Sequence, residues 1–261
     1  MVRRRVGSNQ YQVRTGSGDV STGPHHDLMQ LAQGSHHVFL DILQRVAPEE
    51  YKNLLVVVAS EEECPPEMLA HLADYPDAQV RRAVANNVNT PPGTLLQLSE
   101  DPDEKTQDGV AKNVNAPSDA VRRVARGCSA ARRRLLVLHP HCPADLLDQL
   151  TQGPQPWQVL VGVVSNPNCP AEVLERIWRD QPTEYMLLAG VSRHPNCPAE
   201  VLRSLAKSPS ASARQAVAGN QSTPPEVLGC LASDDTLDVR RAALENPNLP
   251  EEYRVLGRVA Q

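Results

Sequence analysis

A proline recurs along most of the chain at an almost constant interval, and this repeat constrains the fold more than any other feature. Successive members are 26, 26, 26, 27, 28, 26 and 26 residues apart. A period of this kind marks a repeat architecture, in which each unit buries its apolar face against its neighbours. The eight members of this anchor column are Pro65, Pro91, Pro117, Pro143, Pro170, Pro198, Pro224 and Pro250.

Each unit is predicted to contain two short helices. Proline suits the first helical position, and an acid stands two residues after it in seven of the eight units, where it favours the positive end of a helix dipole. In seven units, apolar residues four and seven positions after the anchor share one helical face. A second helical pattern precedes the next anchor, as in "AQVRRAVANN" at 78–87 and "LDVRRAALEN" at 237–246. Tight turns stiffened by proline are expected between the helices.

Asparagine or histidine stands four residues before seven of the anchors. Asparagine tolerates left-handed backbone geometry and bonds locally to peptide groups, so this position is predicted to end the second helix. The members of this Asn column are Asn87, Asn113, His139, Asn166, His194, Asn220 and Asn246.

The repeat suggests three regions. Residues 1–24, rich in Gly, Ser and Arg, are predicted to be a flexible basic arm. Residues 25–53 carry the helical patterns "DLMQLAQ" and "HHVFLDILQRV" and are predicted to form an N-terminal helical cap. The solenoid is predicted to span residues 54–261, because "LLVVVASEEECPP" at 54–66 aligns with the second half of a unit.

Composition and charge exclude several classes of protein. The net charge is −5, with a basic segment at residues 1–23 and an acidic remainder, which does not suggest a nucleic-acid channel. The longest purely apolar run, "LLVVVA" at 54–59, is too short to cross a membrane. No apolar stretch follows the N-terminal arginines as in a signal peptide, and six cysteines form no dense disulfide framework. A cytoplasmic protein with no membrane partner is expected.

Two units in particular, residues 64–91 and 223–250, resemble the leucine-rich repeat variant (LRV) family. The resemblance covers roughly residues 50–261 and implies an all-α, right-handed superhelical solenoid of short paired helices, alternately α and 3₁₀. The founding type of the family carries an iron–sulfur module held by clustered cysteines. Here only Cys64 precedes residue 128, so that chemistry is not expected.

Four of the six cysteines stand immediately before an anchor proline. A thiol at a helix N-terminus can be reactive, which leaves a reactive or metal-binding role open. The same column also holds Thr90, Ala116, Thr223 and Leu249, which favours packing, and "HPHCP" at 139–143 is interpreted in the same way. No metal and no cofactor are predicted. The cysteines of this column are Cys64, Cys142, Cys169 and Cys197.

Arginines recur in the second helices and could either contact a partner or pair with acids of adjacent units. The first arginine column, which includes Arg81, Arg214 and Arg240, is interrupted by Gln107, Val159 and Met186 in this alignment. The column one residue further on is expected to be more exposed. It is the candidate for partner contact and consists of Arg82, Asp108, Arg134, Gln215 and Arg241.

No nucleotide loop, GxSxG elbow or paired acid and base stands out from the repeat, so the protein is predicted not to be an enzyme. A non-enzymatic repeat scaffold that binds a protein or peptide over an extended surface is the first hypothesis. The alternative is nucleic-acid binding through the arginine stripe and the basic arm. A redox or metal protein is a third hypothesis.

Overall fold

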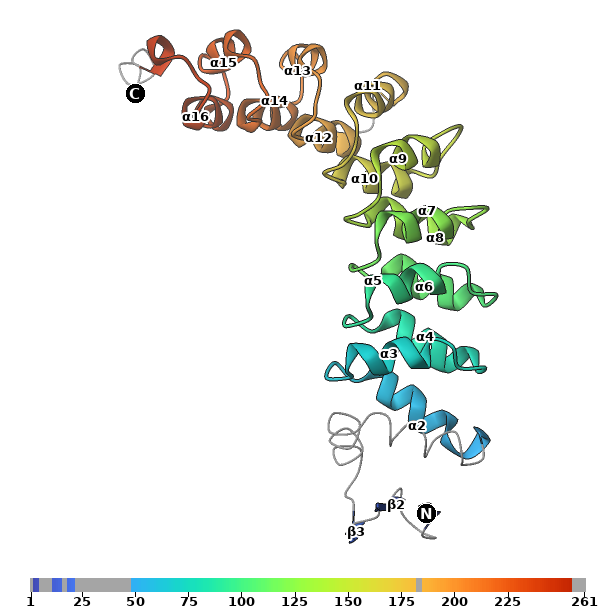
Figure 1. Cartoon of the computed structure of the whole chain (residues 1–261). Helices are drawn as coiled ribbons and strands as arrows, with labels where there is room; N and C mark the ends of the chain where they lie inside the picture. Colours follow the sequence, from blue (N-terminus) through green and yellow to red (C-terminus); the bar gives the residue numbers. More distant parts are fainter. Residues whose placement is uncertain (1, 5–10, 16–17, 22–47, 182–184, 255–261) are drawn as a thin grey trace. The chain divides into compact units, whose positions relative to one another are not determined.

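The computed structural model describes residues 2–4, 11–15, 18–21, 48–181 and 185–254 (Figure 1). The chain divides into two compact units, residues 1–128 and 129–261, and each is described by itself. The two helical patterns predicted within residues 25–47 lie outside the described residues. The helix α2, Pro48–Ser60, includes the segment that was predicted to begin the repeat array.

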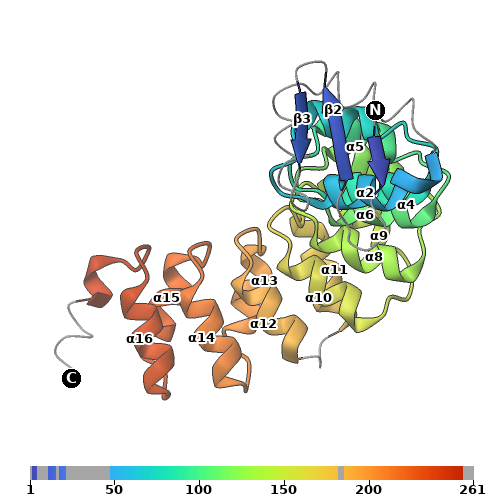
Figure 2. The ribbon, with the colours of Figure 1, turned by 90° about the horizontal axis from the view of Figure 1, so that it is seen from below.

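Three short strands lie within the N-terminal segment that was predicted to be an arm. They are β1 Val2–Arg4, β2 Tyr11–Thr15 and β3 Gly18–Ser21. They pair antiparallel in the order β1-β2-β3, with Val13 opposite both Val2 and Val20 (Figure 2). These strands were not predicted from the sequence, because a segment rich in Gly and Ser was interpreted as flexible.

From residue 48 onward the described chain is built of helix pairs, which confirms the predicted solenoid of helical repeats. In the first unit, α3, α5 and α7 follow the anchor prolines, and α4 and α6 are the second helices. Their bounds are α3 Pro66–Leu72, α4 Ala78–Asn86, α5 Pro92–Leu98, α6 Glu104–Lys112 and α7 Ser118–Val124.

The second unit continues the same alternation. Figure 1 shows its first helices in one row and its second helices in another, and Figure 2 shows α12, α14 and α16 following one another. The first helices are α9 Ala144–Leu150, α11 Ala171–Asp180, α13 Ala199–Leu205 and α15 Pro225–Leu231. The second helices are α8 Ala130–Leu138, α10 Trp157–Ser165, α12 Tyr185–Arg193, α14 Ala211–Gly219 and α16 Leu237–Glu245.

Both helices of a pair are α-helical throughout the residues that the structure describes. The tighter 3₁₀-type bonds, which link an amide to the carbonyl three residues earlier, occur instead in the turns. Thr90 N, for example, donates to Asn87 O over 3.1 Å, and Tyr75 N donates to Leu72 O over 3.1 Å. The family resemblance implied that one helix of each pair has 3₁₀ geometry. In the structure this geometry occurs in the turns, and the helices are α.

The sequence predicted that each first helix begins at its anchor proline, but the proline is the N-cap and the helix begins one residue later. Pro65 has extended backbone angles, φ −60° and ψ 141°, and is the N-cap of α3. Its carbonyl accepts from Leu69 N over 3.1 Å, which closes the first helical turn. Proline fits here because its φ matches the N-cap and its missing amide needs no partner.

The apolar residues predicted to share one face of the first helices form the core. They are all buried, and the two largest in α3, Leu69 and Leu72, are 0% and 2% exposed. Small residues bring successive second helices close together. A Cβ added to Gly162 would lie 2.6 Å from Val137 Cγ2, so only glycine fits between α8 and α10. Gly190 makes the same close approach to Val164, between α10 and α12.

The Asn column joins each repeat to the one before it. Asn113 Nδ2 donates to Ala85 O over 3.0 Å and to Asn87 O over 2.8 Å, and its Oδ1 accepts from Asn115 N. The same pattern recurs at Asn87, Asn166, Asn220 and Asn246. The predicted left-handed geometry is wrong, because Asn87 has φ −74° and ψ 128°. Asparagine therefore suits this column because its side-chain amide donates to buried carbonyls, and not because of its backbone conformation.

The Asn column ends at Asn246, and Arg254 then donates to carbonyls that side chains of a next repeat would bind. Its Nη2 donates to Asn246 O over 3.1 Å and to Pro247 O over 2.9 Å, and its Nε donates to Leu249 O. In other repeats the equivalents of Asn246 O and Pro247 O accept from side chains of the following repeat, as Asn87 O does from Asn113 and Val88 O does from Asn115. Arg254 therefore satisfies the same carbonyls by a different side chain.

Candidate interaction surface

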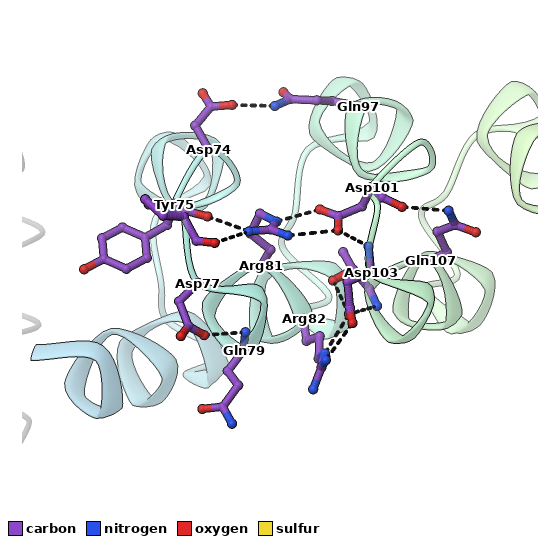
Figure 3. A network of polar contacts seen from close by, with 12 residues as sticks. Asp74, Tyr75, Asp77, Gln79, Arg81, Arg82, Gln97, Asp101, Asp103 and Gln107 are labelled. Atoms are coloured by element: carbon purple, nitrogen blue, oxygen red, sulfur yellow. Dashed lines mark hydrogen bonds and ion pairs between the residues drawn. The ribbon is translucent and has the colours of Figure 1, made fainter. Parts of the chain in front are cut away.

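An arginine in the fourth position of the second helix connects two repeats. Arg81 Nε and Nη2 lie 2.6 and 3.1 Å from the two carboxylate oxygens of Asp101, which belongs to the next repeat (Figure 3). Its Nη1 donates to the carbonyls of Tyr75 and Pro76 in its own repeat. Arg214 makes the equivalent bonds to Asp234, which confirms that this column pairs with acids of adjacent repeats.

The structure corrects the predicted members of this first arginine column. Helices α10 and α12 begin at Trp157 and Tyr185, so their fourth residues are Leu160 and Leu188, not Val159 and Met186. The extra residues of the 27- and 28-residue intervals lie before these helices and shift the register. Leu160 and Leu188 are buried, which suits the apolar replacement of an arginine.

The candidate partner residues Arg82 and Asp108 lie on α4 and α6 of the first unit. Arg82 is already engaged, because its Nε and Nη2 each lie 2.6 Å from an oxygen of Asp103 (Figure 3). This hydrogen bonding holds the pKa of the Asp103 carboxyl well below its usual range. Asp108 is half-buried. These two positions are therefore less exposed than the sequence analysis expected.

The candidate residues Arg134, Gln215 and Arg241 lie on α8, α14 and α16 of the second unit and are exposed. Arg241 meets only Glu245 of its own helix, at 3.8 Å, with both side chains largely in solvent. An exposed pair of this kind leaves the guanidinium accessible. The exposure predicted for this column is therefore found at its three members in the second unit.

Sequence reasoning missed three large apolar side chains on second helices of the second unit. Leu138 of α8, Trp157 of α10 and Met186 of α12 are 62%, 56% and 69% exposed. They occupy the ninth, first and second positions of their helices, and Arg134 occupies the fifth. At 100° per residue these positions fall within an arc of about 100°. We call Leu138, Trp157, Met186 and Arg134 the outer surface of the second unit.

Helix packing places these side chains on adjacent helices, Leu138 at the end of α8 and Trp157 and Met186 at the starts of α10 and α12. Helices α8 and α10 pack against each other, and α10 packs against α12. The glycines at Gly162 and Gly190 allow this close approach. The signal was present in the sequence as apolar residues on the polar side of each helical pattern, but three single residues do not stand out among many repeats.

The cysteines before the anchors are buried, which confirms their interpretation as packing residues. Cys64, Cys169 and Cys197 are at most 5% exposed. Burial raises the pKa of Cys64 to about 11 and the pKa of Cys169 and Cys197 to about 12. The nearby helix N-terminus therefore does not activate them, because loss of solvent around the thiolate is the larger effect.

Within the described residues, no group of three His, Cys, Asp or Glu side chains is placed to hold a metal ion. In "HPHCP", His139 is buried and its Nδ1 accepts from His141 N over 3.1 Å, as Asn side chains do in this column. His194 makes the same turn with Asn196 N, and its Nε2 lies 2.8 Å from Asn166 O. Both histidines thus replace asparagine as structural residues.

Stacked helix pairs, a carbonyl-binding Asn column and a buried leucine face together define a helical repeat protein. The model of the family described as leucine rich repeat variant matches residues 78–103, which span α4 and α5. This match confirms the resemblance seen in the sequence. A comparison with curated proteins finds no match.

Solved structures resemble the chain at low identity. One is described as a leucine-rich repeat variant with a novel repetitive protein structural motif; it is 20% identical, with a TM-score of 0.45 over 74% of this chain and 80% of that chain. Two engineered proteins are 17% and 16% identical, each with a TM-score of 0.25. They cover 88% and 84% of this chain and 98% and 96% of their own.

Where the chain is described, none of its helices combines the length and apolar character needed to span a bilayer.

Proposed function

We propose that the protein is a non-enzymatic scaffold that binds a protein or peptide partner through the outer surface of its second unit. The observation that carries this proposal is the exposure of Leu138, Trp157 and Met186 on three packed helices. Large apolar side chains gathered on one face of a soluble protein mark interaction sites. Trp, Met and Arg are also the residue types enriched at protein interfaces.

The surroundings of this surface suit a helix or an extended peptide. The neighbouring outward positions hold Val161 and Ala189, which are half-buried, so the surface between the large side chains is low and weakly polar. Arg134 adds a cation at one edge, and Arg193 at the end of α12 adds another exposed cation. A partner segment with apolar anchors and flanking acids matches this arrangement.

The remaining candidate column extends the proposed surface along the second helices. Gln215 and Arg241 are exposed on α14 and α16 and could add polar contacts at its margin. Arg82 and Asp108 belong to the first unit and are candidates for a separate contact. Arg82 would then have to bind through atoms that Asp103 leaves accessible.

Nucleic-acid binding remains the alternative, but the ion pairs do not favour it. Arg81, Arg82 and Arg214 are each bonded to two carboxylate oxygens within the chain. A guanidinium that is already paired with a carboxylate contributes less to phosphate binding. Salt-dependent binding to DNA or RNA would support the alternative, since release of counterions makes such binding weaken steeply with salt.

Affinity capture with matched variants tests the proposal. The full chain and a triple variant, Leu138→Ser, Trp157→Ser and Met186→Ser, are used as baits in native lysate with quantitative mass spectrometry. A control bait carries Gln149→Ser, Glu172→Ser and Ser204→Ala, three exposed positions on α9, α11 and α13. We expect the same proteins to be enriched by the wild type and the control, and to be lost with the triple variant. Equal enrichment by all three baits would contradict the proposed surface.

A further inference from the structure

Each arginine that bridges two repeats occupies a site whose hydrogen-bond acceptors the structure defines. At Arg81 the acceptors are Asp101 of the next repeat and the carbonyls of Tyr75 and Pro76 in the turn before its helix (Figure 3). Arg214 repeats this arrangement with Asp234 and the carbonyls of Ser208 and Pro209. Each site is therefore one carboxylate and two turn carbonyls around a planar cation.

The same acceptor positions recur around α10, but the arginine does not. Counted back from the start of the second helix, Pro154 and Gln155 correspond to Tyr75 and Pro76, and counted from the start of the next first helix, Asp180 corresponds to Asp101. Leu160 stands at the position of Arg81. All four of these residues line one pocket of about 420 Å³.

Charge in this pocket favours a cation. Asp180 makes no hydrogen bond or ion pair with any residue that the structure describes, and it is exposed. The one arginine in the lining is neutralised, because Arg176 Nη1 lies 2.7 Å from Asp148 Oδ1 and its Nη2 lies 2.6 Å from Thr151 Oγ1. Asp180 therefore carries a negative charge in the pocket lining that no described positive charge pairs with.

The walls suit the rest of an arginine side chain. Leu160 and Ile177 supply apolar surface for its methylene groups, and Gln152, Gln155 and Gln181 also line the pocket. Arginine buries its aliphatic stem in this way while its planar head makes paired bonds to a carboxylate. A lysine ammonium would satisfy fewer of the fixed acceptors.

We propose that this pocket binds the guanidinium of an arginine side chain supplied by a protein or peptide partner. The incoming group would take the place that Arg81 and Arg214 fill in their own repeats, against Asp180 and the turn carbonyls at Pro154 and Gln155. This inference names a partner residue and rests on the proposed binding function. It does not require that the outer surface be the contact.

The chain supplies a matched control. Leu188 holds the same position in α12 and is buried like Leu160. The residue of the next repeat that corresponds to Asp180 is Ser208, which is not a carboxylate. An arginine placed at residue 188 would therefore find Ser208 at the position of Asp101, whereas one placed at residue 160 would find Asp180.

The first experiment compares Leu160→Arg with Leu188→Arg by thermal unfolding of the full chain. We expect the L160R midpoint to stay within about 2 °C of the wild type, a shift of less than about 1 kcal/mol for a protein of this size. The L188R midpoint should fall well below it, because a buried charge is left unpaired. If L160R is destabilised as much as L188R, the acceptors are not arranged as proposed.

The second experiment uses a peptide-like probe and does not depend on those variants folding. N-acetyl-arginine N-methylamide is titrated into isotope-labelled full chain, with N-acetyl-lysine N-methylamide as the comparison. We expect the arginine probe to shift the amide signals of Gln155 and Asp180, and Asp180→Asn to abolish the shift. No shift, an equal response to the lysine probe or an unchanged response in D180N would overturn the proposal. Equal partner capture by the wild type and the triple variant, with an intact probe response, would instead count only against the outer surface.

Discussion

Asn113 donates from its Nδ2 to the backbone carbonyl of Asn87, 2.8 Å away, and so ties one repeat to the equivalent residue of the repeat before it. The same amide also reaches Ala85 O. Both groups are buried, so neither carbonyl can be satisfied by solvent if the side chain is removed. Within each unit, the Asn column therefore connects successive repeats.

Asn113→Ala should destabilise the protein by about 2 kcal/mol, since it leaves the buried carbonyl of Ala85 without a side-chain donor and takes one of two donors from Asn87 O, which keeps its bond from Thr90 N. Asn113→His should cost about half as much, because His194 shows that an imidazole can keep one carbonyl bond and the bond to the amide two residues on. Chemical denaturation measures both. Equal losses for the two variants would show that the column does not act through these carbonyls.

Gly162→Ala should destabilise the second unit by about 1–3 kcal/mol, because the added methyl would lie 2.6 Å from Val137 Cγ2. Gly219→Ala, in which nothing lies within 4 Å of the new methyl, should stabilise by up to about 1 kcal/mol through helix propensity. Thermal unfolding of the two variants provides the comparison. A neutral or stabilising G162A would mean that α8 and α10 pack less closely than described.

Cysteine labelling should distinguish packing from reactivity. Cys230 is exposed and should react with iodoacetamide at pH 8 in the native protein. Cys169 and Cys197 should react at least tenfold more slowly, because burial raises their pKa to about 12 and leaves little thiolate. Peptide mass spectrometry after timed quenching gives the rates. Rapid native labelling of Cys169 would restore the reactive-thiol hypothesis.

Acid should weaken the connections made by arginine. Hydrogen bonding to Arg82 and Arg214 lowers the pKa of Asp103 and Asp234 in the folded protein. A lowered folded pKa contributes stability above the unfolded value of about 4, and this contribution is lost as pH falls below it. Urea midpoints measured between pH 7 and pH 2.5 should drop most steeply below pH 4. Asp234→Asn should flatten that drop, and an unchanged profile would argue against the ion pair.

The repeat made much of the fold predictable. The anchor prolines and the apolar positions of the first helices have local causes, so the helix pairs and the buried Leu69 and Leu72 followed from the sequence. The role of Asn113 did not, because its partners lie 28 and 26 residues away and are backbone atoms that carry no sequence signal.

The candidate site was harder to predict for the same kind of reason. The register of α10 depends on where a single extra residue is accommodated, and this decides whether Leu160 or Val159 replaces the arginine. The exposure of Trp157 depends on its position at the first turn of a helix, where an apolar residue is locally indistinguishable from a core residue. Only the three-dimensional stacking separates the two.

Site-specific photo-cross-linking tests the central claim, that partners bind the outer surface of the second unit, most directly. The cross-linking residue p-benzoylphenylalanine is placed at Gln158, which adjoins Trp157, or at Gln149 of α9; both positions are exposed. After irradiation in native lysate, the account predicts cross-linked partner from position 158 and little or none from position 149. Cross-links that arise equally from both positions, or from position 149 alone, would contradict it.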